Sequence, residues 1–132
     1  MTTREDRLRA MKEMREKVNR ELTALRRQDF ASLEGRAITS TVAAARYGVP
    51  QNTIYEWMKR GYVRILGQKP RRVFLLNEAD VAFTAAVYHV RKRYGTSRGA
   101  PLLRREGDEW VPNLLERPFQ RFVRKPQSPT GG

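Results

Sequence analysis

Residues 51–56 of this chain, QNTIYE, place three side chains that can exchange hydrogen bonds with DNA bases close together. Amides such as Gln51 and Asn52 can bond N6 and N7 of adenine at once, and a carboxylate such as Glu56 can accept from N4 of cytosine. The segment opens a predicted helix, and the first residues of a recognition helix are those that reach base edges. We therefore predict that Gln51, Asn52 and Glu56 read DNA sequence, the alternative being a solvated face.

Other side chains around this segment suit the phosphate backbone of DNA. Contacts to phosphates fix the register of a protein on the duplex without reading its sequence, and hydroxyl groups and cations supply them. The residues predicted to make such contacts are Thr41, Thr53, Tyr55, Lys59 and Arg60.

A second group of cations, Lys69, Arg71 and Arg72, occupies the segment 67–72. No acidic residue occurs between positions 56 and 78, so the charge of this segment is not balanced locally. A thin basic hairpin fits the minor groove of DNA, whose negative potential attracts arginine. We predict that these three residues contact the minor groove, the alternative being an ordinary polar turn.

The chain lacks the residues on which most catalytic sites depend. It has no cysteine, which excludes disulfides, zinc fingers and thiol catalysis. Its one histidine, His89, lies on a crowded predicted helix, and we interpret it as a packed side chain. Because no phosphate-binding glycine loop and no paired catalytic carboxylates are evident, we predict no enzyme, no metal and no cofactor.

Two short helices must position the predicted base-reading residues. Thr39, Ser40 or Thr41 can cap a first helix that runs to about position 46. Gly48 can adopt the positive φ that ends a helix. Pro50 suits the first turn of a second helix that runs to position 60. Ile54 and Trp57 have the spacing of its buried face, so the residues of 38–60 predict a helix-turn-helix.

A hairpin and a third helix follow in the sequence. Apolar, partly β-branched runs at 62–66 and 73–76 predict two strands joined by the basic segment 67–72, a wing beside the helix-turn-helix. Asn77 can cap a helix that runs to about position 94. Apolar residues surround most of that helix, so we expect it to be buried on several sides.

The N-terminal region, residues 1–30, predicts an amphipathic helix over 3–27. Thr2 or Thr3 can cap it, and residues 28–37 read as a connection with Gly35 as a breaker. Its apolar side chains recur at steps of three, four and seven. This stripe either packs on the chain's own globular part or serves self-association or docking on a partner. Its members are Leu8, Met11, Val18, Leu22 and Leu25.

The C-terminal extension, residues 96–132, contains five of the seven prolines of the chain. A small hairpin is predicted over 102–111, and the last residues have the composition of a flexible end. The three predicted segments are thus the N-terminal helix, a globular domain over 37–95 and this Pro- and Arg-rich extension. The fold class is mainly α with a small β-hairpin.

The charge of the chain favours polyanionic partners. The formal net charge is +13 over 132 residues, and residues 31–95 carry eleven basic and four acidic side chains. Double-stranded DNA is the first expected partner. No apolar run approaches the ~20 residues that span a bilayer, so we expect no membrane partner. We expect the protein to be located in the cytoplasm, associated with the nucleoid, or to be associated with a virion.

The run from Gly48 to Gly61, GVPQNTIYEWMKRG, resembles the winged helix-turn-helix shared by phage excisionases and MerR regulators. In those proteins a polar-polar-Thr-aliphatic-Tyr-x-Trp run is followed by a glycine, a basic hairpin and an acid-capped helix, and residues 38–80 match in order. The resemblance implies sequence-specific DNA binding, with helix 51–60 in the major groove and wing 67–72 in the minor groove. It also implies an excisionase-like or small regulatory role in a phage or mobile element, with a recombinase as a possible protein partner.

An alternative function is a DNA-recognition or structural adaptor subunit of a larger assembly, such as packaging, virion or transcription machinery. The N-terminal helix and the C-terminal extension would then hold the chain to other proteins.

Overall fold

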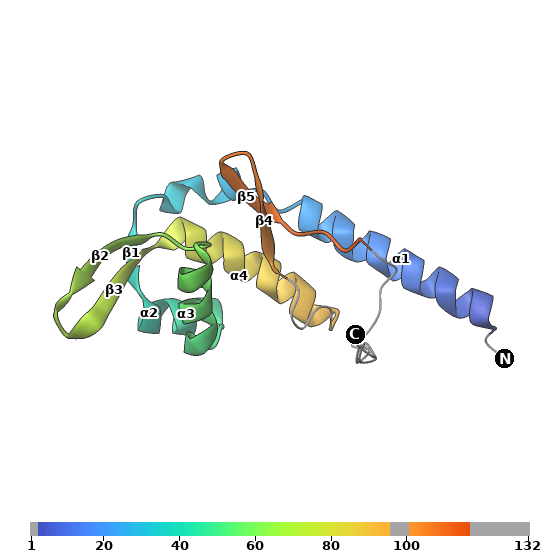
Figure 1. The fold of residues 1–132 in the computed structure, drawn as a ribbon, viewed down its shortest axis with the longest axis horizontal. Coiled ribbons are helices and arrows are strands. Elements are labelled where there is room, and N and C mark those ends of the chain that lie inside the picture. The colour runs from blue at the N-terminus through green and yellow to red at the C-terminus, as the bar shows by residue number, and fades with distance from the viewer. Residues whose placement is uncertain (1–2, 96–100, 117–132) are drawn as a thin grey trace, which may run out of the picture.

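The computed structural model describes residues 3–95 and 101–116, and within them the fold is mainly helical with a three-stranded antiparallel sheet (Figure 1). The helices are α1 (Arg4–Thr23), α2 (Ser40–Tyr47), α3 (Gln51–Arg60) and α4 (Glu78–Arg93), with 3-10 turns η1 (Arg27–Leu33) and η2 (Pro70–Arg72). The strands are β1 (Ala37–Thr39), β2 (Ile65–Lys69), β3 (Val73–Asn77), β4 (Leu103–Glu106) and β5 (Glu109–Pro112).

The two short predicted helices are confirmed as α2 and α3. The Thr39 hydroxyl accepts a hydrogen bond from the backbone N–H of Val42 at 3.2 Å, which satisfies a donor at the start of α2. Gly48 ends α2 with φ +64° and Gly61 ends α3 with φ +79°, conformations that an L side chain adopts only with strain. The turn between the helices is therefore encoded locally.

The sheet differs from its prediction in two ways. Its order is β1-β3-β2, and β1 was not predicted, because a three-residue strand carries too short a pattern to recognise. The first strand of the hairpin begins at Ile65 rather than at position 62. Tyr62 and Val63 are 5% and 2% exposed, so burial in the core accounts for their apolar character. The same strand continues to Lys69, three residues beyond its predicted end, so the tip comprises only Pro70–Arg72 instead of 67–72.

Helix α4 lies in the middle of the molecule, between α1 and the α2–α3 pair (Figure 1). Its cap is the predicted one, because the Asn77 side chain accepts from the N–H of Ala79 at 3.2 Å. Buried positions occur around its circumference, and Phe83 and Val87 lie in the hydrophobic core. The prediction that this helix is buried on several sides is confirmed.

The N-terminal helix is shorter than predicted. Thr3 caps it in a capping box with Asp6, but α1 ends at Thr23 instead of position 27, and η1 follows. The physical reason lies in tertiary contacts: the ring of Phe30 packs edge-on against that of Phe83 with 6.0 Å between centroids, and Arg27 pairs with a carboxylate of α4. Residues 27–33 therefore form η1 against α4 and do not continue α1.

The apolar stripe of α1 divides into two parts. Val18 and Leu22 are fully buried in the core of the chain itself, and Leu25 packs against it, whereas Leu8 is 47% exposed. For Val18 and Leu22 the first alternative, packing on the chain's own globular part, is therefore confirmed, and no surface of these two side chains is left for a partner. Self-association or docking through the exposed part of the stripe stays a prediction.

This division predicts unequal effects for one substitution at two sites on α1. Leu22→Ala removes a buried side chain and should lower the free energy of unfolding by about 2–4 kcal/mol. Leu8→Ala is the matched control and should change it by less than about 0.5 kcal/mol, as surface substitutions do. Urea unfolding followed by circular dichroism measures both. Equal losses of stability in the two variants would show that α1 does not pack on the hydrophobic core through Leu22.

The predicted C-terminal hairpin is confirmed as β4 and β5, which pair antiparallel with Leu103 opposite Pro112. Leu103 is buried in the same core cluster as Val18 of α1 and Ile54 of α3, so one core includes side chains from all three predicted segments. The predicted flexible end, residues 124–132, lies outside the described residues. None of the helices in the described part of the chain is both long enough and apolar enough to cross a membrane.

Candidate nucleic-acid interface

One face of α3 is buried and the opposite face is open. Ile54 and Trp57 point into the core, and the ring of Trp57 packs edge-on against Tyr88 of α4 with 5.9 Å between centroids. Asn52, Tyr55, Glu56, Lys59 and Arg60 are exposed, and Thr53 is half-buried. The buried face thus fixes which side chains the helix presents outward.

Gln51 differs from the other predicted base-reading residues because its amide is already engaged. Its Nε2 lies 3.2 Å from Ser40 Oγ, 3.2 Å from Thr41 Oγ1 and 3.0 Å from the hydroxyl of Tyr55. These contacts hold the start of α3 against the start of α2. Reading a base with this amide requires some of these hydrogen bonds to be exchanged, so Gln51, Thr41 and Tyr55 act first as parts of a helix–helix contact.

Asn52 and Glu56 are exposed, and the structure engages them little. Glu56 lies 3.7 Å from the ammonium of Lys59 one turn on, and both side chains are largely exposed. An exposed pair of this kind contributes about 0–1 kcal/mol, so it exchanges partners readily. Of the three predicted base readers, Asn52 and Glu56 are therefore the two that are available without rearrangement.

The three predicted wing cations are all exposed: Lys69 is the last residue of β2, and Arg71 and Arg72 lie in the tip of the β2–β3 hairpin. Arg71 and Arg72 have φ +67° and +60°, the left-handed region that L residues populate with strain. Among residues 3–95 and 101–116, no carboxylate lies within ion-pairing distance of Lys69, Arg71 or Arg72. Placing arginine at these two positions lowers the stability of the turn, because glycine would adopt the same positive φ without strain.

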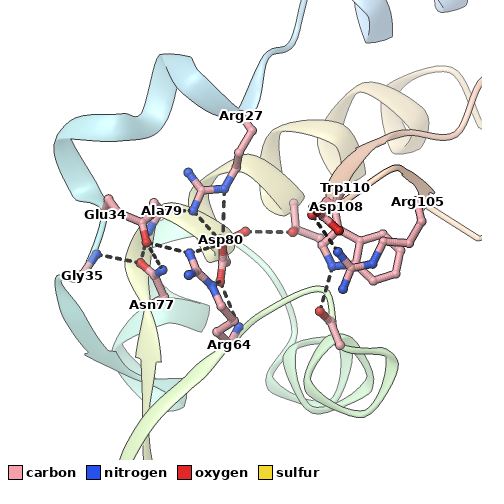
Figure 2. Close-up of polar contacts among 12 residues, drawn as sticks. Arg27, Glu34, Gly35, Arg64, Asn77, Ala79, Asp80, Arg105, Asp108 and Trp110 are labelled. Carbon is pink, nitrogen blue, oxygen red and sulfur yellow. Dashed lines mark hydrogen bonds and ion pairs between the residues drawn. The ribbon is translucent and has the colours of Figure 1, made fainter.

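Other arginines of the chain have structural partners instead. Asp80, at the start of α4, accepts hydrogen bonds from Arg27 Nη2 at 2.7 Å and from Arg64 Nε at 2.9 Å (Figure 2). Glu34 lies 2.6 Å from each of the same two guanidinium groups. The Asp80 side chain is 7% exposed, so its charge is compensated by these partners. We call these four residues the arginine–carboxylate network.

The network ties the segment before β2 to three other parts of the fold. Asp80 Oδ2 also accepts from the backbone N–H of Arg64 at 2.9 Å, and Glu34 Oε2 accepts from Asn77 Nδ2 at 2.8 Å. The hydrogen bond from Asn77, with the two arginines, lowers the pKa of Glu34 to about 2. The hydrogen bond to Asp80 raises the pKa of Arg64 above its ordinary value. Both shifts keep the network charged.

The shifted carboxylate predicts a loss of stability in acid. A group whose pKa is lowered by folding contributes stability above its ordinary pKa of 4.5, and loses it as the pH falls toward about 2. The thermal midpoint should therefore fall across this window, and less steeply in Glu34→Gln. Glu13→Gln, which removes an exposed carboxylate of α1, is the matched control and should follow the wild type. Parallel curves for Glu34→Gln and wild type would contradict the assignment.

A second buried carboxylate joins α2 to α4. Glu78 Oε2 accepts from the Tyr47 hydroxyl at 2.5 Å and from Arg46 Nη1 at 2.8 Å. Burial alone would raise the pKa of Glu78, but these two hydrogen bonds outweigh it and the pKa is lowered. Burial and the contact with Glu78 raise the pKa of Tyr47 to about 12. The pair therefore stays as phenol and carboxylate at neutral pH and holds α2 in place.

Several of these positioning residues were missed by sequence reasoning. Arg27 and Asp80 are 53 positions apart, and Arg46 and Glu78 are 32 apart, so no local spacing connects them. His89, interpreted as a packed side chain, lies with Nε2 2.6 Å from the carbonyl of Tyr47. In the part of the chain that the structure describes, no cluster of side chains is arranged to hold a metal.

No protein-family model, curated protein or solved structure matches this chain. A function for it must therefore rest on its own residues.

Proposed function

We propose that residues 37–95 form a winged helix-turn-helix that binds double-stranded DNA in a sequence-specific manner. In this proposal α3 enters the major groove with Asn52 and Glu56 toward base edges, and the tip of the β2–β3 hairpin enters the adjacent minor groove. The resemblance of 48–61 to excisionases and MerR regulators supports an accessory or regulatory role in recombination or transcription.

The observation that carries this proposal is that the arginines and lysines of α3 and of the end of the β2–β3 hairpin are exposed and little paired, unlike the arginines that hold the fold. Those that hold the fold, such as Arg27, Arg46 and Arg64, pair with carboxylates. Those on the outer face of α3 and on the hairpin tip have at most one weak partner, and these two elements lie at the end of the molecule opposite the start of α1 (Figure 1). Cations left unpaired by a fold are available to phosphates.

Strain at the hairpin tip supports the same interpretation. Residues held in sparsely populated backbone conformations cluster at binding sites, where the surrounding structure maintains them. Arg71 and Arg72 supply long cationic side chains at two positions where the backbone favours glycine. A minor groove attracts arginine through its negative potential, which gives these residues a use that a purely structural turn lacks.

Base reading by α3 is tested by Asn52→Ala. A duplex obtained by selection from a random-sequence pool with the wild-type protein is compared with a scrambled duplex of the same composition. Loss of a bidentate amide–adenine contact should reduce the discrimination between the two by about 1–3 kcal/mol, with little change in affinity for the scrambled duplex.

The matched control is Gln28→Ala, which removes an exposed amide of η1 away from α3. It should leave both affinities at their wild-type values. Undiminished discrimination in Asn52→Ala would mean that α3 does not read bases through this side chain, and equal loss in both variants would point to a non-specific cause.

A further inference from the structure

The segment from Gly61 to Arg64 joins α3 to β2, and we call it the joint. It contains no regular structure, yet it sets the angle between the proposed reading helix and the proposed wing. Arg64, at its far end, is held by the arginine–carboxylate network through both its backbone N–H and its guanidinium group. The near end, at Gly61 and Tyr62, is held by a part of the chain almost fifty residues away.

Trp110 of β5 supplies that second attachment. Its indole Nε1 donates to the backbone carbonyl of Gly61 at 2.9 Å, and its ring packs edge-on against Tyr62 with 5.0 Å between centroids. A Cβ added to Gly61 would lie 3.9 Å from the Trp110 ring, so a side chain at this position would meet the indole in ordinary van der Waals contact. A hydrogen bond and a ring contact together fix position and direction.

The hairpin that carries Trp110 is itself anchored. Arg105 lies with its guanidinium carbon 4.3 Å from the centre of the Trp110 ring and donates to the carbonyl of Asp108 at 2.9 Å (Figure 2). At the other end of β4, Leu103 is buried in the core. Trp110 lines two hollows, of about 480 Å³ and 410 Å³, and the smaller one is also lined by Gly61, Tyr62 and Arg64 of the joint.

We infer that Trp110 is a positioning residue for DNA binding: it fixes the joint so that α3 and the β2–β3 hairpin reach their two grooves together. This inference rests on the proposed function. The C-terminal hairpin is then a brace for the reading unit, and Trp110 acts through Gly61 and Tyr62 without touching DNA. Loss of the Trp110 side chain should therefore allow the β2–β3 hairpin to change its position relative to α3.

The test uses the full chain and the duplex selected with wild-type protein. Trp110→Ala removes the hydrogen bond and the ring contact, and Trp110→Phe keeps an aromatic ring against Tyr62 while lacking the N–H. We expect a loss in affinity of about 3- to 30-fold for Trp110→Ala and a smaller loss for Trp110→Phe. If Trp110→Ala unfolds at the assay temperature, Trp110→Phe carries the test.

Leu114→Ala is the matched control for general destabilisation. Leu114 is a half-buried apolar residue beyond the hairpin that lines the larger hollow and not the one that adjoins the joint. A merely structural role predicts that this variant and the Trp110 variants lose affinity only in proportion to their unfolded fraction. A positioning role predicts loss in the Trp110 variants while they are fully folded.

A double-mutant comparison distinguishes the two roles, because a purely structural role of Trp110 would leave the effects of other substitutions on affinity unchanged. Arg71→Ala should weaken binding less in the Trp110→Ala background than in the wild type, because a displaced hairpin no longer reaches its groove. Asn52→Ala should weaken binding equally in both backgrounds, because α3 stays packed on the core through its own buried side chains Ile54 and Trp57.

The outcomes separate this inference from the proposed function. If wild-type protein does not prefer its selected duplex over a scrambled one, the proposed function fails and the inference fails with it. If wild-type protein shows that preference but the effects of Trp110→Ala and Arg71→Ala simply add, the inference alone is overturned. Coupling of Trp110 with Arg71 and not with Asn52 supports it.

Discussion

Replacing both Arg71 and Arg72 by glycine is expected to stabilise the protein and to weaken its binding to DNA. A left-handed conformation costs an L residue about 1–2 kcal/mol, and the greater freedom of glycine in the unfolded chain offsets about 0.5–1 kcal/mol of that gain. The net increase in the free energy of unfolding should be about 0.5–1 kcal/mol at each position. Urea unfolding measures it.

The same double variant loses two cations that the proposed function places on DNA. The slope of log affinity against log salt concentration should become shallower by about 1.8, since each phosphate contact contributes about 0.9. At fixed salt the loss in affinity should be on the order of tenfold to a hundredfold. Opposite changes in stability and affinity are the signature of residues retained for binding.

Two controls separate charge, strain and location. Alanine at both positions removes the same cations but keeps the strained backbone, so it should weaken DNA binding without the gain in stability. Arg4→Ala with Arg7→Ala removes the same charge from exposed positions of α1, at the far end of the molecule from the hairpin (Figure 1). If the α1 variant weakens binding as much as the hairpin variant, the charge acts only in bulk and the wing is not a contact.

Asp80→Ala should change the free energy of unfolding more than the glycine substitutions at Arg71 and Arg72 do, and in the opposite direction. It removes a carboxylate that is 7% exposed and leaves Arg27 and Arg64 without one of their two acidic partners. Breaking a fully buried ion pair costs about 3–5 kcal/mol, and an exposed pair about 0–1 kcal/mol. Because the Arg64 side chain is 58% exposed and can turn to water, we expect a loss of about 2–3 kcal/mol.

The control for Asp80→Ala is Asp29→Ala, which removes an exposed carboxylate from η1 and should change stability by less than about 0.5 kcal/mol. Thermal unfolding of both variants at neutral pH measures the difference. A loss in Asp80→Ala no greater than that in Asp29→Ala would mean that the network contributes nothing to the attachment of η1 and the joint to α4.

The parts of the fold that were predicted correctly are those with local signals. Gly48 and Gly61 mark positions where the chain must adopt positive φ, and Asn77 marks a helix start, so α2, α3 and the start of α4 were located to within a residue or two. The alternation of two apolar runs around a basic turn likewise located the β2–β3 hairpin. Each of these signals lies within a few residues of the feature it encodes.

The parts that could not be predicted depend on contacts between distant residues. The end of α1 is set by Phe30 meeting Phe83, and β2 starts late because Tyr62 and Val63 are core residues. The contact between Trp110 and Gly61 spans 49 positions. No periodicity or spacing rule reports such pairs, so the residues that position the candidate site could not be named from the sequence. The residues proposed to contact DNA were named from the sequence and remain a prediction.

The salt dependence of binding to a selected and to a scrambled duplex tests the central claim most directly. With about five phosphate contacts, binding to the selected duplex should give a log–log slope near −4.5. The selected duplex should remain the tighter ligand at every salt concentration. Equal affinity for the two duplexes, or a slope near zero, would contradict sequence-specific binding by α3 and the β2–β3 hairpin.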